Sequence, residues 1–174
     1  ISSYQHIDSL SFAHVDAQAF AGFLTSKSGG NVPEANIRML LNEQATQGNM
    51  AAAMDWLLEE SQSGDKAVIF FAGHGDMETK TMMQHGFLLA HDAPPTTYMA
   101  GGTFPVFYLQ SIISTLSTQK NVEVMMFSDA CRAGKLAGSS IGGPQATAQV
   151  LAAQFANEVK VLSCQPNEFS LEGT

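Results

Sequence analysis

The sequence predicts an α/β fold in which helices cover both faces of a mostly parallel β-sheet. Two apolar runs, Val68–Phe71 and Val122–Phe127, have the character of strands that are buried on both faces. A helical pattern separates them, and strands that alternate with helices and short links are typical of a parallel sheet. The two runs are therefore expected to be adjacent parallel central strands joined by a right-handed crossover.

The first third of the chain supplies a helix, a short strand and a second helix. Apolar residues at helical spacing predict a helix over residues 16–24. Residues 36–41 have the composition of a short strand. Thr46 is the expected N-cap of a helix over 46–60, which carries an apolar stripe. These elements precede the first central strand, as the alternation requires.

The rest of the chain alternates in the same way. Loops are expected at 76–86 and 92–104, which are polar or rich in Pro and Gly. The other expected elements are a strand over 86–90, a helix over 106–116, a Gly- and Ser-rich loop over 134–144, a helix over 147–159 and a last strand over 159–163.

Composition narrows the class of protein. A chain of 174 residues with 45% hydrophobic residues is long enough for one folded domain with a substantial core. A net charge of −8 argues against nucleic acid as a partner and favours a cationic one. No run of 18 apolar residues predicts a membrane span, and no N-terminal signal pattern is present. Cys131 and Cys164 are both expected to be reduced, which favours a cytoplasmic location.

Each of the two apolar runs ends in a reactive side chain. The first continues into Gly-His-Gly, which contains His74, and the second into Asp-Ala-Cys, which contains Cys131. The carboxyl edge of a parallel sheet is where α/β folds form their sites. A lone buried cysteine is more often a core residue, and a lone histidine in a glycine turn more often makes a local hydrogen bond. The joint pattern instead predicts a nucleophile and its proton-transfer partner.

The strings FFAGHG (70–75) and SDACRAG (128–134), in this order and spacing, resemble the two signatures of the caspase-like cysteine peptidases. The resemblance is closest to the metacaspase and bacterial caspase-homologue branch, and segments 10–24 and 160–173 are similar to further parts of that family. It implies a caspase-like three-layer α/β/α sandwich over residues 1–174.

The resemblance also implies a division of the chain. Residues 1–134 correspond to a large subunit, 135–144 to a flexible linker, and 145–174 to the start of a small subunit. The family's first central strand is expected before Ile1, and its final strands and helix after Thr174. The missing small-subunit part of the same protein would then be one partner of this chain.

By resemblance, Cys131 is the expected nucleophile and His74 the general acid, with a possible second role as the base. The backbone N–H groups of Gly75 and Cys131 are the expected oxyanion donors. Gly73 is expected to let the substrate backbone approach, and Ala72 to line the substrate site. The remaining histidines, His91 among them, are expected to be solvated.

Three carboxylates are expected to form an acidic S1 pocket beside the nucleophile. Asp129 stands where caspases have Gln and metacaspases have Asp, Asp16 matches a second acidic pocket position, and Glu172 stands where caspases have a pocket Arg. Such a pocket would bind Arg or Lys at P1 and repel Asp. The alternatives are that Asp16 caps its helix, that Asp129 caps a turn and that Glu172 is a surface charge.

The sequence therefore predicts a cysteine endopeptidase that cleaves peptides or proteins after Arg or Lys. The alternatives are a catalytically silent caspase-fold interaction module and a separase-like or legumain-like hydrolase. No cofactor is expected, although the resemblance leaves calcium open. Asp76, Glu78 and Asp92 are candidate ligands, but no dense run of acidic residues supports them.

Overall fold

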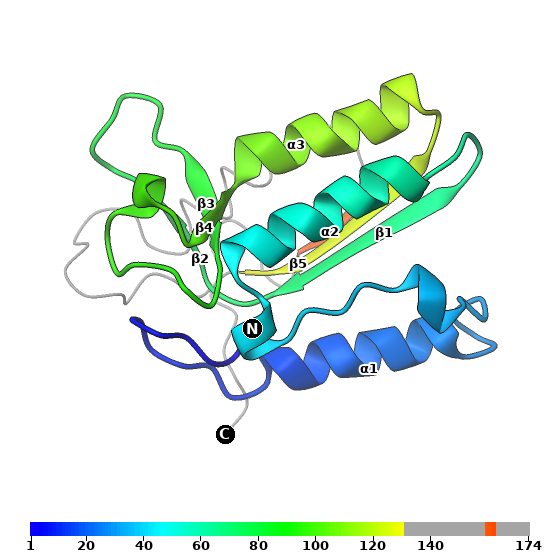
Figure 1. The fold of residues 1–174 in the computed structure, drawn as a ribbon, viewed down its shortest axis with the longest axis horizontal. Helices are drawn as coiled ribbons and strands as arrows, with labels where there is room; N and C mark the ends of the chain where they lie inside the picture. The colour runs from blue at the N-terminus through cyan, green and yellow to red at the C-terminus, as the bar shows by residue number, and fades with distance from the viewer. Residues whose placement is uncertain (131–158, 163–174) are drawn as a thin grey trace.

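The computed structural model describes residues 1–130 and the strand at 159–162. Its central sheet contains β1 (Lys66–Ala72), β5 (Glu123–Asp129) and β6 (Val159–Leu162), in the order β1-β5-β6. β1 pairs with β5 in parallel, and so does β6 (Figure 1). This confirms the prediction of two adjacent parallel strands from the two apolar runs, and the last strand expected over 159–163.

Helices lie on both sides of this sheet. Helix α1 (Ala13–Thr25) covers one face, whereas α2 (Gln47–Glu60) and α3 (Val106–Ser114) lie over the other (Figure 1). α3 continues into a π-helical turn, η4 (Thr115–Gln119). Thr46 caps α2 as predicted, because its Oγ1 accepts from the N–H of Asn49 at 3.3 Å.

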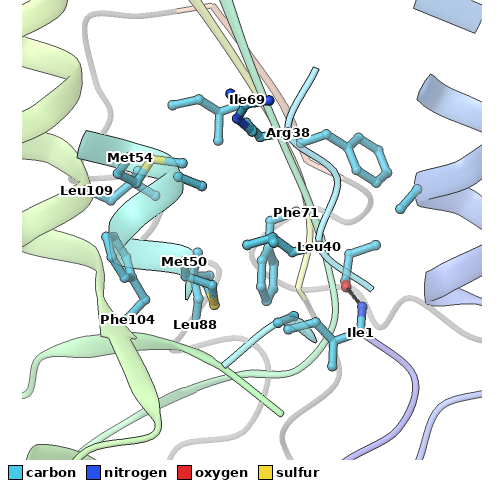
Figure 2. Close-up of a pocket in the computed structure, with 15 residues that line it drawn as sticks. Ile1, Arg38, Leu40, Met50, Met54, Ile69, Phe71, Leu88, Phe104 and Leu109 are labelled. Carbon is cyan, nitrogen blue, oxygen red and sulfur yellow. Dashed lines mark hydrogen bonds between the residues drawn. The ribbon is translucent and has the colours of Figure 1, made fainter. Parts of the chain in front are cut away.

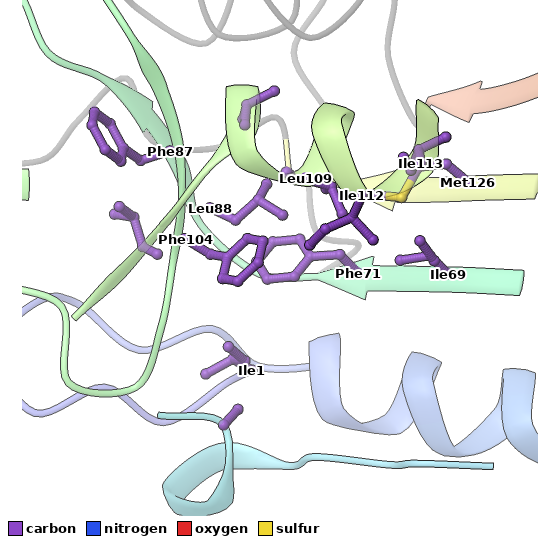
Figure 3. Close-up of a cluster of buried hydrophobic side chains, with 14 of the residues drawn as sticks. Ile1, Ile69, Phe71, Phe87, Leu88, Phe104, Leu109, Ile112, Ile113 and Met126 are labelled. Carbon is purple, nitrogen blue, oxygen red and sulfur yellow. The ribbon is translucent and has the colours of Figure 1, made fainter. Parts of the chain in front are cut away.

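The alternation of β1 side chains explains the layers. Phe70 faces α1, where Phe20 stacks on it with ring centroids 4.6 Å apart. Ile69 and Phe71 point to the opposite face and join the buried cluster that Leu109 of α3 enters (Figure 3). β1 is thus covered on both faces, as its uninterrupted apolar run predicts, although Phe70 on the α1 side is only half-buried.

A second, antiparallel sheet follows β1. It contains β2 (Gly75–Met77), β3 (Gly86–Leu89) and β4 (Thr103–Pro105), in that order. The strand expected at 86–90 is confirmed, but the expected loops at 76–86 and 92–104 were wrong where β2 and β4 lie. Both strands are three residues long and contain Gly or Pro, so only their pairing with the buried β3 makes them strands.

The strand expected over residues 36–41 was also wrong. Short 3₁₀ turns, η1 (Glu34–Asn36) and η2 (Asn42–Gln44), flank this segment. Its backbone is extended at Ile37 and Leu41, yet it forms no ladder with any described strand. Grooves separate it from β1, and one of them is an apolar cavity of about 120 Å³ beneath α2 (Figure 2). An extended segment without a partner within hydrogen-bonding distance cannot be a strand.

The expected loop over 134–144 and helix over 147–159 lie outside the described residues. In the part of the chain that is described, no helix combines the length and the apolar character needed to cross a bilayer.

Candidate active site

His74 lies where the two sheets meet. It follows β1 by two residues and immediately precedes β2. The N–H of Gly73 donates to the carbonyl of Asp129 at 3.1 Å, and the carbonyl of His74 accepts from the N–H of Leu89 at 2.8 Å. The histidine backbone is therefore held from the central sheet on one side and from β3 on the other.

The imidazole of His74 is buried, with 5% of the residue exposed. Its Nε2 lies 2.9 Å from the backbone carbonyl oxygen of Asp8. Because a carbonyl oxygen only accepts, Nε2 carries a proton in this arrangement. In the neutral ring Nδ1 then has the lone pair, so Nδ1 is the nitrogen that can take up and return a proton.

Tyr4 holds the same residue from a second direction. The N–H of His74 donates to Tyr4 Oη at 2.8 Å, and the two ring centroids are 4.9 Å apart. The phenol is buried, and burial raises its pKa above the usual value for tyrosine. The tyrosine hydroxyl therefore stays protonated at neutral pH.

The two glycines that flank His74 occupy crowded positions. A Cβ on Gly73 would lie 2.7 Å from Tyr4 Oη and 3.0 Å from the Phe71 ring, so a side chain would displace the tyrosine. This close approach is a structural reason for Gly73, separate from the expected contact with substrate. Gly75 is buried and pairs with Leu88 in the small sheet.

Asp76 is a buried carboxylate two residues beyond His74. Only 5% of it is exposed, and it accepts from the Tyr98 hydroxyl and, at 2.8 Å, from the N–H of Met77. Burial raises the pKa of Asp76, while the two donors and the nearby His74 oppose that change. The sequence offered Asp76 only as a candidate calcium ligand.

The other candidate calcium ligands do not gather around it. Glu78 accepts from the N–H groups of Lys80 and Thr81 at 2.9 and 3.0 Å, and Asp92 accepts from the N–H of Gln47 at 3.0 Å. Within the described residues, no group of three or more His, Cys, Asp or Glu side chains could hold a metal ion.

The predicted pocket residues are described only in part. Asp129 ends β5 and is half-buried, in register with Ala72 at the end of β1. Asp16 is exposed in the first turn of α1, and α1 begins at the end of the sheet where β1 finishes (Figure 1). It does not cap this helix, because Phe12 occupies the N-cap position and no side chain makes a capping hydrogen bond. Cys131 and Glu172 lie outside the described residues.

The structure thus brings Ala72, His74, Gly75 and Asp129 to one edge and adds residues that the sequence did not single out. Tyr4 and the Asp8 carbonyl come from 70 and 66 residues away, in a segment without a motif. His91 was expected to be solvated, which was wrong. It is 6% exposed, and its Nδ1 lies 2.7 Å from the Ser3 carbonyl oxygen, where the N-terminal segment covers it.

His74 lies at the carboxyl edge of the parallel strands, which is where α/β folds form their sites. The sequence profile of peptidase family C14, described as the caspase domain, matches residues 1–174. The chain therefore belongs to the caspase domain family, which assigns it to the cysteine-peptidase-like class and agrees with the observed α/β fold.

No curated protein matches the chain. Among solved structures, a crystal structure of a Geobacter sulfurreducens protein is similar, with 19% identity and a TM-score of 0.45. That match covers 57% of this chain and 36% of the Geobacter protein's length.

Proposed function

We propose that this chain is the core of a cysteine endopeptidase that cleaves after Arg or Lys, with His74 and Cys131 as its catalytic pair. The observation that carries the proposal is the register of the central sheet, in which Ala72 is paired with Asp129. His74 follows Ala72 by two residues, and Cys131 follows Asp129 by two residues.

Because the two offsets are equal, His74 and Cys131 follow neighbouring strand ends at the same distance along the chain. Paired strands lie about 4.8 Å apart, and two residues of chain span at most about 7 Å. Asp129, two residues before Cys131, therefore lies at the same edge of the sheet as Ala72, two residues before His74. Membership of the caspase domain family supports the same pairing.

The hydrogen bonds of His74 suit it to proton transfer. With Nε2 directed to the Asp8 carbonyl, Nδ1 takes the proton of the Cys131 thiol as Sγ attacks the scissile carbonyl carbon. The carbonyl oxygen becomes an oxyanion, which the N–H groups of Gly75 and Cys131 would stabilise. The intermediate then expels the amine, which receives its proton from Nδ1.

The second half of the cycle reverses these roles. Water attacks the thioester and gives a proton to Nδ1, and the carbon–sulfur bond breaks. The sulfur leaves with that proton from Nδ1, so the thiol and the neutral imidazole are both restored. The cycle balances with water as the co-reactant, and no oxidation state changes in it.

Specificity for basic residues is proposed from charge. Asp129 is at the carboxyl edge beside Ala72, and the first turn of α1 brings Asp16 to the same end of the molecule. Glu172 would complete the acidic pocket. A guanidinium can bind a carboxylate through two parallel hydrogen bonds, so Arg is expected to be preferred over Lys and strongly over Asp.

The test is a panel of peptide substrates that differ only at P1, assayed on the full-length protein with and without calcium. We expect turnover with Arg and Lys, and none in Cys131→Ala. Asp129→Asn is expected to lower kcat/KM for Arg substrates about 30-fold or more, because losing one partner of a desolvated charge pair costs about 2–5 kcal/mol.

Three outcomes would contradict parts of this proposal. Equal cleavage after Arg and Asp would refute the acidic pocket and leave the catalytic pair standing. A folded wild-type protein without turnover on any peptide would favour the silent interaction module, and turnover confined to other P1 residues would favour another type of cysteine hydrolase.

A further inference from the structure

We propose that Tyr4 is a positioning residue for His74, and that its hydroxyl fixes the backbone orientation on which proton transfer depends. The catalytic consequence rests on the proposed function, in which His74 takes part in the reaction. Tyr4 itself contacts neither the thiol nor the substrate in this scheme. It acts through the histidine backbone and ring.

The hydroxyl continues the hydrogen bonding of β1 beyond the end of the strand. The parallel ladder with β5 ends at Ala72, and the N–H of Gly73 still donates to Asp129. The next N–H, that of His74, is not part of this ladder and donates instead to Tyr4 Oη at 2.8 Å. A buried backbone N–H must be paired, so the position of this oxygen determines the orientation of the 73–74 peptide group.

The tyrosine ring limits the imidazole as well. The two rings are tilted by 40° with centroids 4.9 Å apart, while Asp8, four residues along the same segment, supplies the acceptor for Nε2. One short segment thus contacts the backbone, the ring face and one ring nitrogen of His74. These contacts select the ring orientation and the tautomer together.

Other parts of the protein fix the tyrosine independently of His74. The Asn42 side chain accepts from the N–H groups of Ser2 and Ser3 at 2.8 and 3.1 Å. His91 bonds this segment on both sides of Tyr4, because its ring contacts the Ser3 carbonyl and its own carbonyl accepts from the N–H of Gln5 at 2.9 Å. The backbone on both sides of Tyr4 is therefore held by bonds that do not involve the His74 side chain or backbone, so Tyr4 can orient the histidine.

Gly73 is the complement of Tyr4 in this arrangement. The hydroxyl occupies the space where a Cβ at position 73 would lie, 2.7 Å away. A methyl group there has to displace the hydroxyl or the peptide that bonds it. The Gly73→Ala and Tyr4→Phe changes should consequently disturb the same contact and show coupling in a double-mutant cycle.

The experiment uses the full chain and two single Tyr→Phe variants, at Tyr4 and at Tyr108. Tyr4→Phe keeps the ring and removes the acceptor, and we expect kcat to fall about tenfold, with KM changed less than twofold. Tyr108→Phe is the matched control, because Tyr108 is 42% exposed and packs on Phe104, and it should leave both constants unchanged.

A second readout separates this proposal from the proposed function. The ¹⁵N shifts of the His74 backbone amide and imidazole should move in Tyr4→Phe, and the Nε2–H tautomer should become less populated. If the wild type turns over no peptide, the endopeptidase proposal fails while these shifts still test the placement of His74 by Tyr4.

The same NMR spectra show whether each variant is folded. If Tyr4→Phe loses stability, the double-mutant cycle with Gly73→Ala still tests the proposal. We expect Gly73→Ala to reduce kcat severalfold in the wild type and by a smaller factor in the Tyr4→Phe background. Unchanged His74 shifts and unchanged kcat in Tyr4→Phe would overturn the proposal. So would a Tyr4→Phe defect that appears only in KM, or effects of the two changes that simply multiply.

Discussion

Replacing Tyr98 by Phe removes the hydroxyl that donates to the buried carboxylate of Asp76. Both residues are more than nine-tenths buried, so water cannot easily replace the lost donor. Hydrogen bonds to charged groups contribute about 1.5–3 kcal/mol. We expect Tyr98→Phe to lower the free energy of unfolding by that amount at pH 8, or the urea midpoint by about 1 M.

The free energy of unfolding that Tyr98→Phe loses should depend on pH, and the direction of that dependence follows from the pKa of Asp76. The pKa of folded Asp76 is raised by burial, so its contribution to stability is fully present below its unfolded pKa and is lost as pH rises through the folded pKa. The Tyr98 hydroxyl lowers that pKa, and its removal raises the pKa further. The cost of Tyr98→Phe should therefore be greatest above the folded pKa and should shrink as the solution is acidified.

Urea denaturation of wild type and Tyr98→Phe between pH 3.5 and pH 8 measures this directly. Asp76→Asn is the matched control, because it keeps an acceptor for the hydroxyl and removes the charge. In that background the cost of Tyr98→Phe should no longer vary with pH. A cost that is independent of pH in the wild-type background, or that grows on acidification, would refute the reasoning.

Two further predictions concern stability. Burial raises the pKa values of Tyr4 and Tyr98, so the stability that their protonated forms contribute should be lost above about pH 10. Tyr4→Phe should therefore make the free energy of unfolding fall less steeply with pH above about pH 10. An unchanged fall would contradict the burial of this phenol. Ile113→Ala should lower the free energy of unfolding by about 2–5 kcal/mol in chemical denaturation, because Ile113 is completely buried in α3. Met83 is exposed, so Met83→Ala should stay within about 0.5 kcal/mol of wild type. Similar losses for both variants would contradict the packing of α3.

The central strands could be predicted from the sequence because their signal is local. β1 and β5 are apolar on both faces, and a short apolar run of this length is typical of a strand inside a covered sheet. The segment at 36–41 has similar residues, but a strand also requires a partner at hydrogen-bonding distance. β2 and β4 show the opposite case, since they have weak patterns and become strands through β3.

The candidate site divides in the same way. His74 was predictable because it follows the end of a strand in a recognisable motif, and Asp129 because it ends the neighbouring strand. Tyr4 and the Asp8 carbonyl were not, since a single tyrosine and a backbone oxygen have no sequence pattern and lie about 70 residues away from the histidine. Tyr4 is connected to the Gly-His-Gly motif by its close approach to Gly73, which can be seen in the structure but not in the sequence.

Covalent labelling tests the central claim most directly, namely that His74 activates Cys131. The full-length protein is treated with a peptidyl chloromethyl ketone carrying Arg at P1, and the adduct is located by mass spectrometry. We expect one adduct, on Cys131 and not on Cys164, and a labelling rate at least tenfold lower in His74→Ala. Labelling at Cys164, or an undiminished rate at Cys131 without His74, would contradict the proposed pair.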